Sequence, residues 1–125
     1  MNKTIFLVGI IFGVLAIVLG AFGAHGLEKV LPEDALATFE TGVRYQMYHA
    51  LLLLFLSSMT AISEKGKKSI FYLITIGVIL FSFSIYLLAI NCLTSFDYRV
   101  IALLTPIGGV FLIFGWIVLG YRAFR

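Results

Sequence analysis

Hydrophobic and polar positions divide this chain into four long apolar segments that are joined by short polar ones. Residues 5–24 and residues 70–91 contain no charged side chain. A helix rises about 1.5 Å per residue, so about 20 apolar residues cross a hydrocarbon core of about 30 Å. Two further apolar segments follow the same pattern with more polar interruptions. The sequence therefore predicts four membrane spans, at about 4–24, 44–62, 70–91 and 98–121.

The segment before the second span, residues 32–43, predicts an amphipathic helix at the membrane surface. Pro32 suits a first helical turn, and Glu33 and Asp34 are favourable beside the positive end of the helix dipole. Apolar side chains then recur at helical spacing on one face. This helix either continues into the second span or joins it at Gly42. Residues 64–68, Glu-Lys-Gly-Lys-Lys, are expected to form a short basic loop with Gly66 as its turn.

A proline interrupts the last apolar segment. The part of this segment from Pro106 to Tyr121 has only sixteen residues. At about 1.5 Å per residue, a helix of that length is too short to cross the membrane comfortably. The helix is therefore expected to begin near residue 97. A kink is expected at Pro106, which has no N–H to offer the carbonyl of Ala102.

Small residues follow one stripe of the first span. They are spaced three and four residues apart, which places them on one side of a helix. Such stripes let helix backbones approach closely where lipid is as apolar as leucine. The predicted helix-packing residues are Gly9, Gly13, Ala16, Gly20 and Ala24.

Composition and charge strengthen the membrane interpretation. The 125 residues are 62% hydrophobic and only 12% charged, too few charges to cover a soluble domain. The predicted fold is a single all-α domain, an integral membrane four-helix bundle. The net charge of +3 comes from scattered Lys and Arg without a basic aromatic face, so nucleic acid is not expected as a partner. Cys92 is the only cysteine, which excludes an intrachain disulfide.

The distribution of basic residues predicts the orientation in the membrane. Four spans put both termini and the 64–68 segment on one side. Six basic residues fall on that side and three on the other, which predicts cytoplasmic termini in a multi-pass plasma-membrane protein. The six are Lys3, Lys65, Lys67, Lys68, Arg122 and Arg125, and the three are Lys29, Arg44 and Arg99.

Polar side chains gather where the second span begins. They lead directly into residues 51–56, which have no polar side-chain atom. An ionisable residue within a span is costly and by default suggests a functional site. The alternative is interhelical hydrogen bonding that fixes the bundle, at about 0.6 kcal/mol per bond. Depth counting places this group in the outer half of the membrane and Trp116 near the inner headgroups. The candidate polar pocket consists of His25, Arg44, Tyr45, Gln46, His49, Ser84, Tyr86, Thr105 and Pro106.

These residues do not form a complete catalytic or metal-binding set. His25 and His49 lack a third ligand at span depth, whereas zinc takes three or four protein ligands. Ser84 with His49 lacks a buried carboxylate that would orient the imidazole. We expect no enzyme activity, no bound metal and no cofactor.

Four blocks of residues resemble a known family. They are GAFGAHGL at 20–27, FxTGVxYQxYHAL at 39–51, FSxSIY at 81–86 and TPIGG at 105–109, the last followed by Gly115-Trp116. In this order they resemble the small membrane-protein family called domain of unknown function 423, along essentially the whole chain. The resemblance implies a four-span plasma-membrane protein and brings no established activity, substrate or catalytic residue.

Three functional hypotheses follow. The leading one is a non-enzymatic membrane protein with a structural or interaction role through helix packing; its partners would be membrane lipids and a second copy or another membrane protein. The alternative is a small-solute or lipid transporter or channel with an outward-facing polar pocket, since polar groups lie beside a proline-broken helix. The third is a metal- or quinone-linked redox helper that uses His25 and His49.

Overall fold

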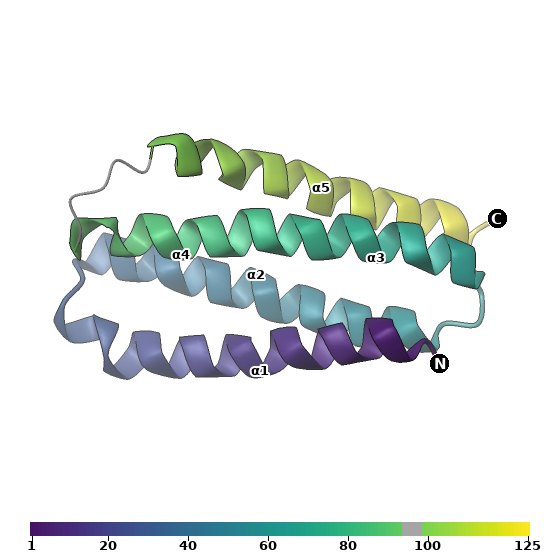
Figure 1. Ribbon diagram of the computed structural model, residues 1–125, viewed down its shortest axis with the longest axis horizontal. Coiled ribbons are helices and arrows are strands. Elements are labelled where there is room, and N and C mark those ends of the chain that lie inside the picture. Colours follow the sequence, from purple (N-terminus) through teal and green to yellow (C-terminus); the bar gives the residue numbers. More distant parts are fainter. Residues whose placement is uncertain (94–98) are drawn as a thin grey trace.

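The computed structural model describes residues 1–93 and 99–125, and these fold as four antiparallel helical rods (Figure 1). The first rod is α1 (Lys3–His25), followed by the short 3-10 helix η1 (Leu27–Lys29), and the second is α2 (Glu33–Ser58). The third consists of α3 (Glu64–Val78), the π-helix η2 (Ile79–Phe83) and α4 (Ser84–Ala89), and ends in η3 (Ile90–Leu93). The fourth is α5 (Arg99–Ala123). The predicted all-α four-helix bundle is confirmed, and both termini lie at one end (Figure 1).

Local sequence accounts for where the helices begin. The Asn2 side-chain oxygen accepts a hydrogen bond from the Ile5 N–H at 3.1 Å and so caps α1. The Ser63 hydroxyl caps α3 in the same way, accepting from the Gly66 N–H at 3.1 Å. Residues 64–68 are therefore the first turn of α3, and the prediction of a basic loop there was wrong. Glu and Lys are good helix formers, and a cap before them outweighs the turn tendency of one glycine.

The amphipathic segment and the second span form one helix. α2 continues unbroken through Gly42, which decides between the two predicted arrangements, and it ends at Ser58, earlier than the predicted residue 62. α5 likewise runs on both sides of Pro106 as one helix. The kink there stays a prediction, and the predicted start near residues 97–98 lies outside the described residues.

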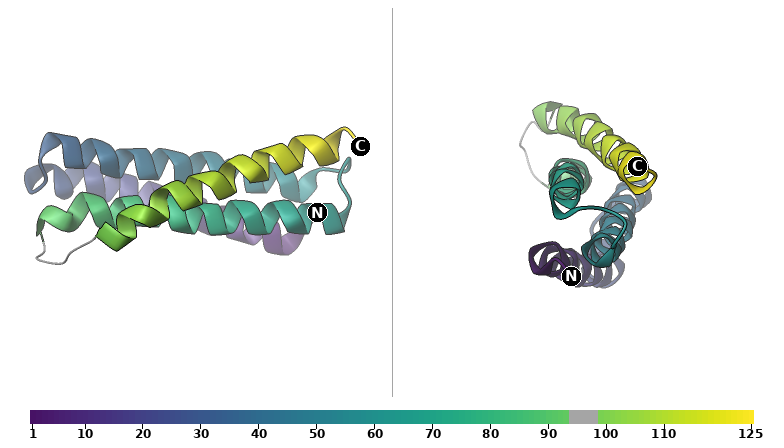
Figure 2. Two further views of the ribbon diagram at one scale, coloured as in Figure 1. Left: turned by 90° about the horizontal axis from the view of Figure 1, so that it is seen from above. Right: turned by 90° about the vertical axis from the view of Figure 1, so that its right-hand side faces the viewer.

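The rods are arranged with α1 and α5 at the two outer positions. α1 packs chiefly on α2, and α5 packs chiefly on α3 and η2, with α2 and the third rod between them (Figure 2). The core lies in the middle, where Leu53, Leu56, Ile70, Ile74 and Val78 are fully buried. The outer faces of α1 and α5 remain apolar and exposed.

Three stretches of the described chain are long and apolar enough to cross a membrane. They are Lys3–Lys29, Glu64–Ala89 and Val100–Ala123. α2 is not among them, because its polar residues interrupt its hydropathy. It nevertheless has 26 residues, about 39 Å of helix, and lies beside α1. Three polar side chains of α2, those of Gln46, His49 and Ser57, are buried among the other rods.

Glycines allow the close approach between α5 and the third rod. A methyl group on Gly108 would overlap the backbone of Leu80 and Phe81, within the π-helical turn. Gly77 and Gly115 face Leu112 and Ile74 at similarly close range. The helices therefore meet backbone to backbone at η2, as small residues permit in membranes.

Candidate functional site

Gln46 lies where three rods meet. Its side chain is fully buried. The Nε2 group donates to the carbonyl oxygen of Phe12 in α1 at 2.8 Å, and Oε1 accepts from the Tyr86 hydroxyl of α4 at 2.6 Å. Both ends of the amide are thus bonded inside the protein, which satisfies a polar group that lipid could not. Gln46 connects α1, α2 and α4.

His49, one turn further along α2, connects this helix to α5. The Trp116 Nε1–H donates to His49 Nε2 at 3.1 Å, while His49 Nδ1 lies 2.6 Å from the carbonyl oxygen of Tyr45. A carbonyl oxygen only accepts, and indole N–H only donates. His49 is therefore neutral, with its proton on Nδ1 and its acceptor nitrogen already occupied.

The observed His49–Trp116 bond corrects the depth prediction. The two side chains were expected in opposite halves of the membrane, yet they are bonded to each other. His49 is sixteen residues from the start of α2 and nine from its end, about 24 Å and 14 Å. It thus lies past the middle of the helix, toward the end that holds both termini.

Hydroxyl groups form a second set of contacts around the π-helical turn. Ser82 is fully buried and donates to the Gly42 carbonyl oxygen of α2 at 2.9 Å. Ser84 donates to the Phe81 carbonyl oxygen at 2.9 Å, and its oxygen lies 2.6 Å from that of Thr105 in α5. A hydroxyl has one proton, so Thr105 is the donor to Ser84. These bonds join η2 and α4 to both neighbouring rods.

Several residues of the predicted pocket do not join these contacts. His25 is exposed at the end of α1, Pro106 is exposed on α5, and Arg44 is exposed and donates to the Thr41 hydroxyl at 3.3 Å. Tyr45 is 41% exposed, and its ring packs against that of Phe81 with centroids 5.1 Å apart. The structure brings together Gln46, His49, Ser84, Tyr86 and Thr105, in interhelical hydrogen bonds rather than around one shared pocket.

A groove does run beside His49 on the surface between α2 and α5. Its volume is about 350 Å³. Apart from the His49 and Trp116 ring nitrogens and the Tyr45 hydroxyl, its lining is apolar. The lining residues are Tyr45, His49, Phe81, Gly109, Leu112, Ile113 and Trp116. Such a lining suits a hydrocarbon chain better than a polar solute.

The predicted packing stripe of α1 faces α2. A methyl group added to Gly9 would lie 2.9 Å from Leu54 Cδ2 and 3.1 Å from the Ala50 carbonyl oxygen. Gly20 faces Val43, and Ala16 is buried. At the end of the stripe the structure differs, because Ala24 is exposed and Gly23 instead contacts the Phe39 ring. Helical spacings of three and four allow either neighbour, and rotation of the helix decides between them.

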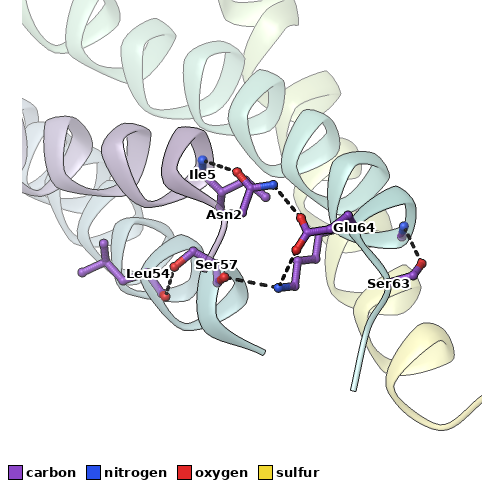
Figure 3. Close-up of polar contacts among 8 residues, drawn as sticks. Asn2, Ile5, Leu54, Ser57, Ser63 and Glu64 are labelled. Atoms are coloured by element: carbon purple, nitrogen blue, oxygen red, sulfur yellow. Dashed lines mark hydrogen bonds and ion pairs between the residues drawn. The ribbon is translucent and has the colours of Figure 1, made fainter. Parts of the chain in front are cut away.

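The end of the bundle that holds both termini contains a polar junction that the sequence did not reveal. Lys67 is almost fully buried, and its Nζ lies 3.3 Å from Glu64 Oε1 and 3.2 Å from the Ser57 carbonyl oxygen. The Asn2 and Glu64 side chains point toward each other (Figure 3), and Asn2 Nδ2 donates to Glu64 Oε2 at 2.8 Å. This junction ties the start of α1 and the end of α2 to the start of α3. Reading 64–68 as a helix after the Ser63 cap would have placed Lys67 on the inner face.

The part of the chain that the structure describes has no set of side chains that could bind a metal ion. There, no three His, Cys, Asp or Glu side chains lie together as a metal site would require.

Fold and contacts define the class: a multi-pass integral membrane protein, built as a small helical bundle with its polar side chains bonded between helices. Residues 19–109 match the family described as "Protein of unknown function (DUF423)". The chain is 39% identical to the UPF0382 membrane protein YwdK of Bacillus subtilis over 98% of both chains. It is 36% identical to a UPF0382 membrane protein of Staphylococcus saprophyticus, again over 98% of both chains. A UPF0382 membrane protein of Haemophilus influenzae is 37% identical over 99% of this chain and 95% of its own. No solved structure matches. The chain belongs to the DUF423 family of membrane proteins.

Proposed function

We propose that this protein has a non-enzymatic, structural or interaction role in the membrane, acting through helix packing with a second copy or another membrane protein. One contrast supports the proposal. The polar groups of Gln46, His49 and Tyr86 are bonded inside the bundle, whereas the outer rods α1 and α5 keep wide apolar faces. These three side chains, here called the polar layer, thus hold the helices together, and the outer faces are left for association.

The exposed apolar faces are long. On α1 they consist of Leu7, Ile10, Ile11, Val14, Leu15, Ile17 and Val18, and on α5 of Val100, Leu103, Ile107, Val110, Ile113, Phe114 and Ile117. The α1 glycine stripe is already used against α2, so it does not support self-association.

Cysteine crosslinking in native membranes tests the proposal. In a Cys92→Ser background, Val14→Cys probes α1 and Ile117→Cys probes α5, since both side chains are more than half exposed. Ser57→Cys is the matched control, because Ser57 is fully buried. We expect a discrete crosslinked product from at least one exposed position and none from the control. A monomer at every exposed position tested along both helices contradicts the proposal.

A second candidate function is the binding of a lipid chain in the groove beside His49. It keeps the lipid form of the transporter alternative and leaves out the small-solute form. The full burial of Gln46 argues against a polar-solute pocket, while the apolar lining of the groove favours hydrocarbon. Trp116 is the only tryptophan and lines the groove, so its fluorescence reports occupancy. Saturable quenching by a spin-labelled fatty acid supports binding. Quenching that only rises in proportion to bulk concentration argues against it.

We also propose that both termini are cytoplasmic. The distribution of Lys and Arg supports this orientation. Alkaline phosphatase fused to the C-terminus is expected to be inactive in cells and a fluorescent protein active. The reverse pattern would contradict the orientation.

A further inference from the structure

A cleft of about 550 Å³ opens at the end of the bundle that holds both termini, between the start of α1 and the start of α3. α1 packs chiefly on α2, which leaves this side of α3 uncovered. The volume falls within the range of about 300–1,000 Å³ typical of small-molecule sites.

The rim of the cleft is polar and positively charged. Asn2, which caps α1, and Thr4 of α1 contribute on one side, and Lys65 and Lys68 contribute from α3. The two lysines are three residues apart, so they are neighbours on one helix face. Both are exposed.

The one acidic residue of the lining does not neutralise these lysines. The Glu64 carboxylate is paired with Lys67 at 3.3 Å and accepts a hydrogen bond from Asn2 at 2.8 Å, toward which it points (Figure 3). No ion pair within residues 1–93 and 99–125 involves Lys65 or Lys68. The rim therefore has an unbalanced positive charge that suits a phosphate group.

The remaining wall is apolar and lies deeper along both helices. Ile5 follows the polar start of α1, and Phe71 and Tyr72 lie one turn beyond Lys68 in α3. From the end of the bundle inward, the charged side chains come first and the apolar side chains follow. A phospholipid presents the same order from headgroup to acyl chain.

We propose that this cleft binds one anionic phospholipid, with its headgroup phosphate between Lys65 and Lys68 and its first methylenes against Phe71 and Tyr72. This binding is independent of the helix-packing role proposed above. It fixes a lipid between the start of α1 and the start of α3.

Lipid titration by native mass spectrometry of the full-length protein tests the proposal. The probe is phosphatidylglycerol, compared with zwitterionic phosphatidylcholine. Near a membrane surface each lysine changes anionic-lipid affinity about fivefold, so Lys65→Gln with Lys68→Gln is expected to weaken phosphatidylglycerol binding about 25-fold. The control is Arg122→Gln with Arg125→Gln, which removes the same charge from the same end outside the cleft, and it is expected to change binding less than about twofold. Equal losses in both variants, or no preference for phosphatidylglycerol in the wild type, overturn the proposal.

Further measurements distinguish binding of the whole lipid from binding of phosphate alone, and loss of binding from loss of folding. Inorganic phosphate in excess is expected to leave phosphatidylglycerol bound; displacement by phosphate overturns the lipid as occupant. Tyr72→Ser is expected to weaken binding severalfold at unchanged lysine charge, and an unchanged affinity overturns the placement of the acyl chain. Because Lys65 and Lys68 are exposed, their variant is expected to keep the wild-type melting temperature. A melting temperature lowered in parallel with binding overturns the assignment of the loss to the cleft.

Discussion

The bond between Tyr86 and Gln46 can be tested as a thermodynamic coupling. Gln46→Leu keeps the volume of the side chain but removes both of its hydrogen bonds, to Phe12 and Tyr86. The Phe12 carbonyl retains its place in the α1 backbone ladder. The Tyr86 hydroxyl, in a side chain only 8% exposed, is left without its partner.

The magnitude follows from these two losses. Interhelical hydrogen bonds in membrane proteins contribute about 0.6 kcal/mol each, so two contribute about 1.2 kcal/mol. Leaving a buried hydroxyl unpaired adds about 1 kcal/mol or more. Gln46→Leu should therefore lower the free energy of unfolding by about 2 kcal/mol. Adding Tyr86→Phe removes the stranded hydroxyl, so the double variant should recover about 1 kcal/mol and be more stable than Gln46→Leu alone.

Unfolding by sodium dodecyl sulfate in mixed micelles, followed by circular dichroism, measures these differences. All four proteins of the cycle are compared under one condition, and the coupling energy is taken from the four midpoints and slopes. If the two single-variant losses simply add in the double variant, the buried Tyr86–Gln46 bond does not hold α2 to α4, and the reasoning fails.

Three other substitutions give distinct outcomes. Gly9→Val should lower the free energy of unfolding by about 1–3 kcal/mol, because the new side chain meets Leu54 and Ala50. Gly120→Ala, with open space around it, should not destabilise the protein. Equal effects of the two in the same micelle assay would refute close α1–α2 packing. Glu64→Gln should destabilise more than Lys67→Met, since only the former leaves a buried ammonium without its anion; thermal unfolding ranks them, and the opposite order would contradict the junction. Trp116→Phe should lower the free energy of unfolding by about 0.6 kcal/mol in the wild type and by nothing measurable in a His49→Phe background. An equal loss in both backgrounds would rule out the His49–Trp116 bond.

The sequence predicted the helices and the face of α1 because those depend on local spacing. Apolar length and glycine periodicity are enough to locate α1 and to orient Gly9 and Gly20 toward a neighbour. It also identified Gln46 and His49 as interior polar groups, since their position inside a span requires partners from other helices.

The remaining features depend on contacts between distant segments. No local signal marks the π-helical turn at Ile79–Phe83, which lies against Gly108 of α5. Trp116 was assigned to an interface because aromatic residues collect there. Its bond to His49 depends on the relative shift of α2 and α5. The exposure of His25 and Pro106 likewise follows from helix rotation, which residue spacing does not determine.

The central claim is that this protein acts by packing against a partner while its polar layer holds the bundle. The stoichiometry of the protein in native-membrane polymer nanodiscs, determined by native mass spectrometry, tests that claim most directly. A defined homo-oligomer or a fixed complex with another membrane protein is the predicted result. A solitary monomer at every expression level would contradict the claim.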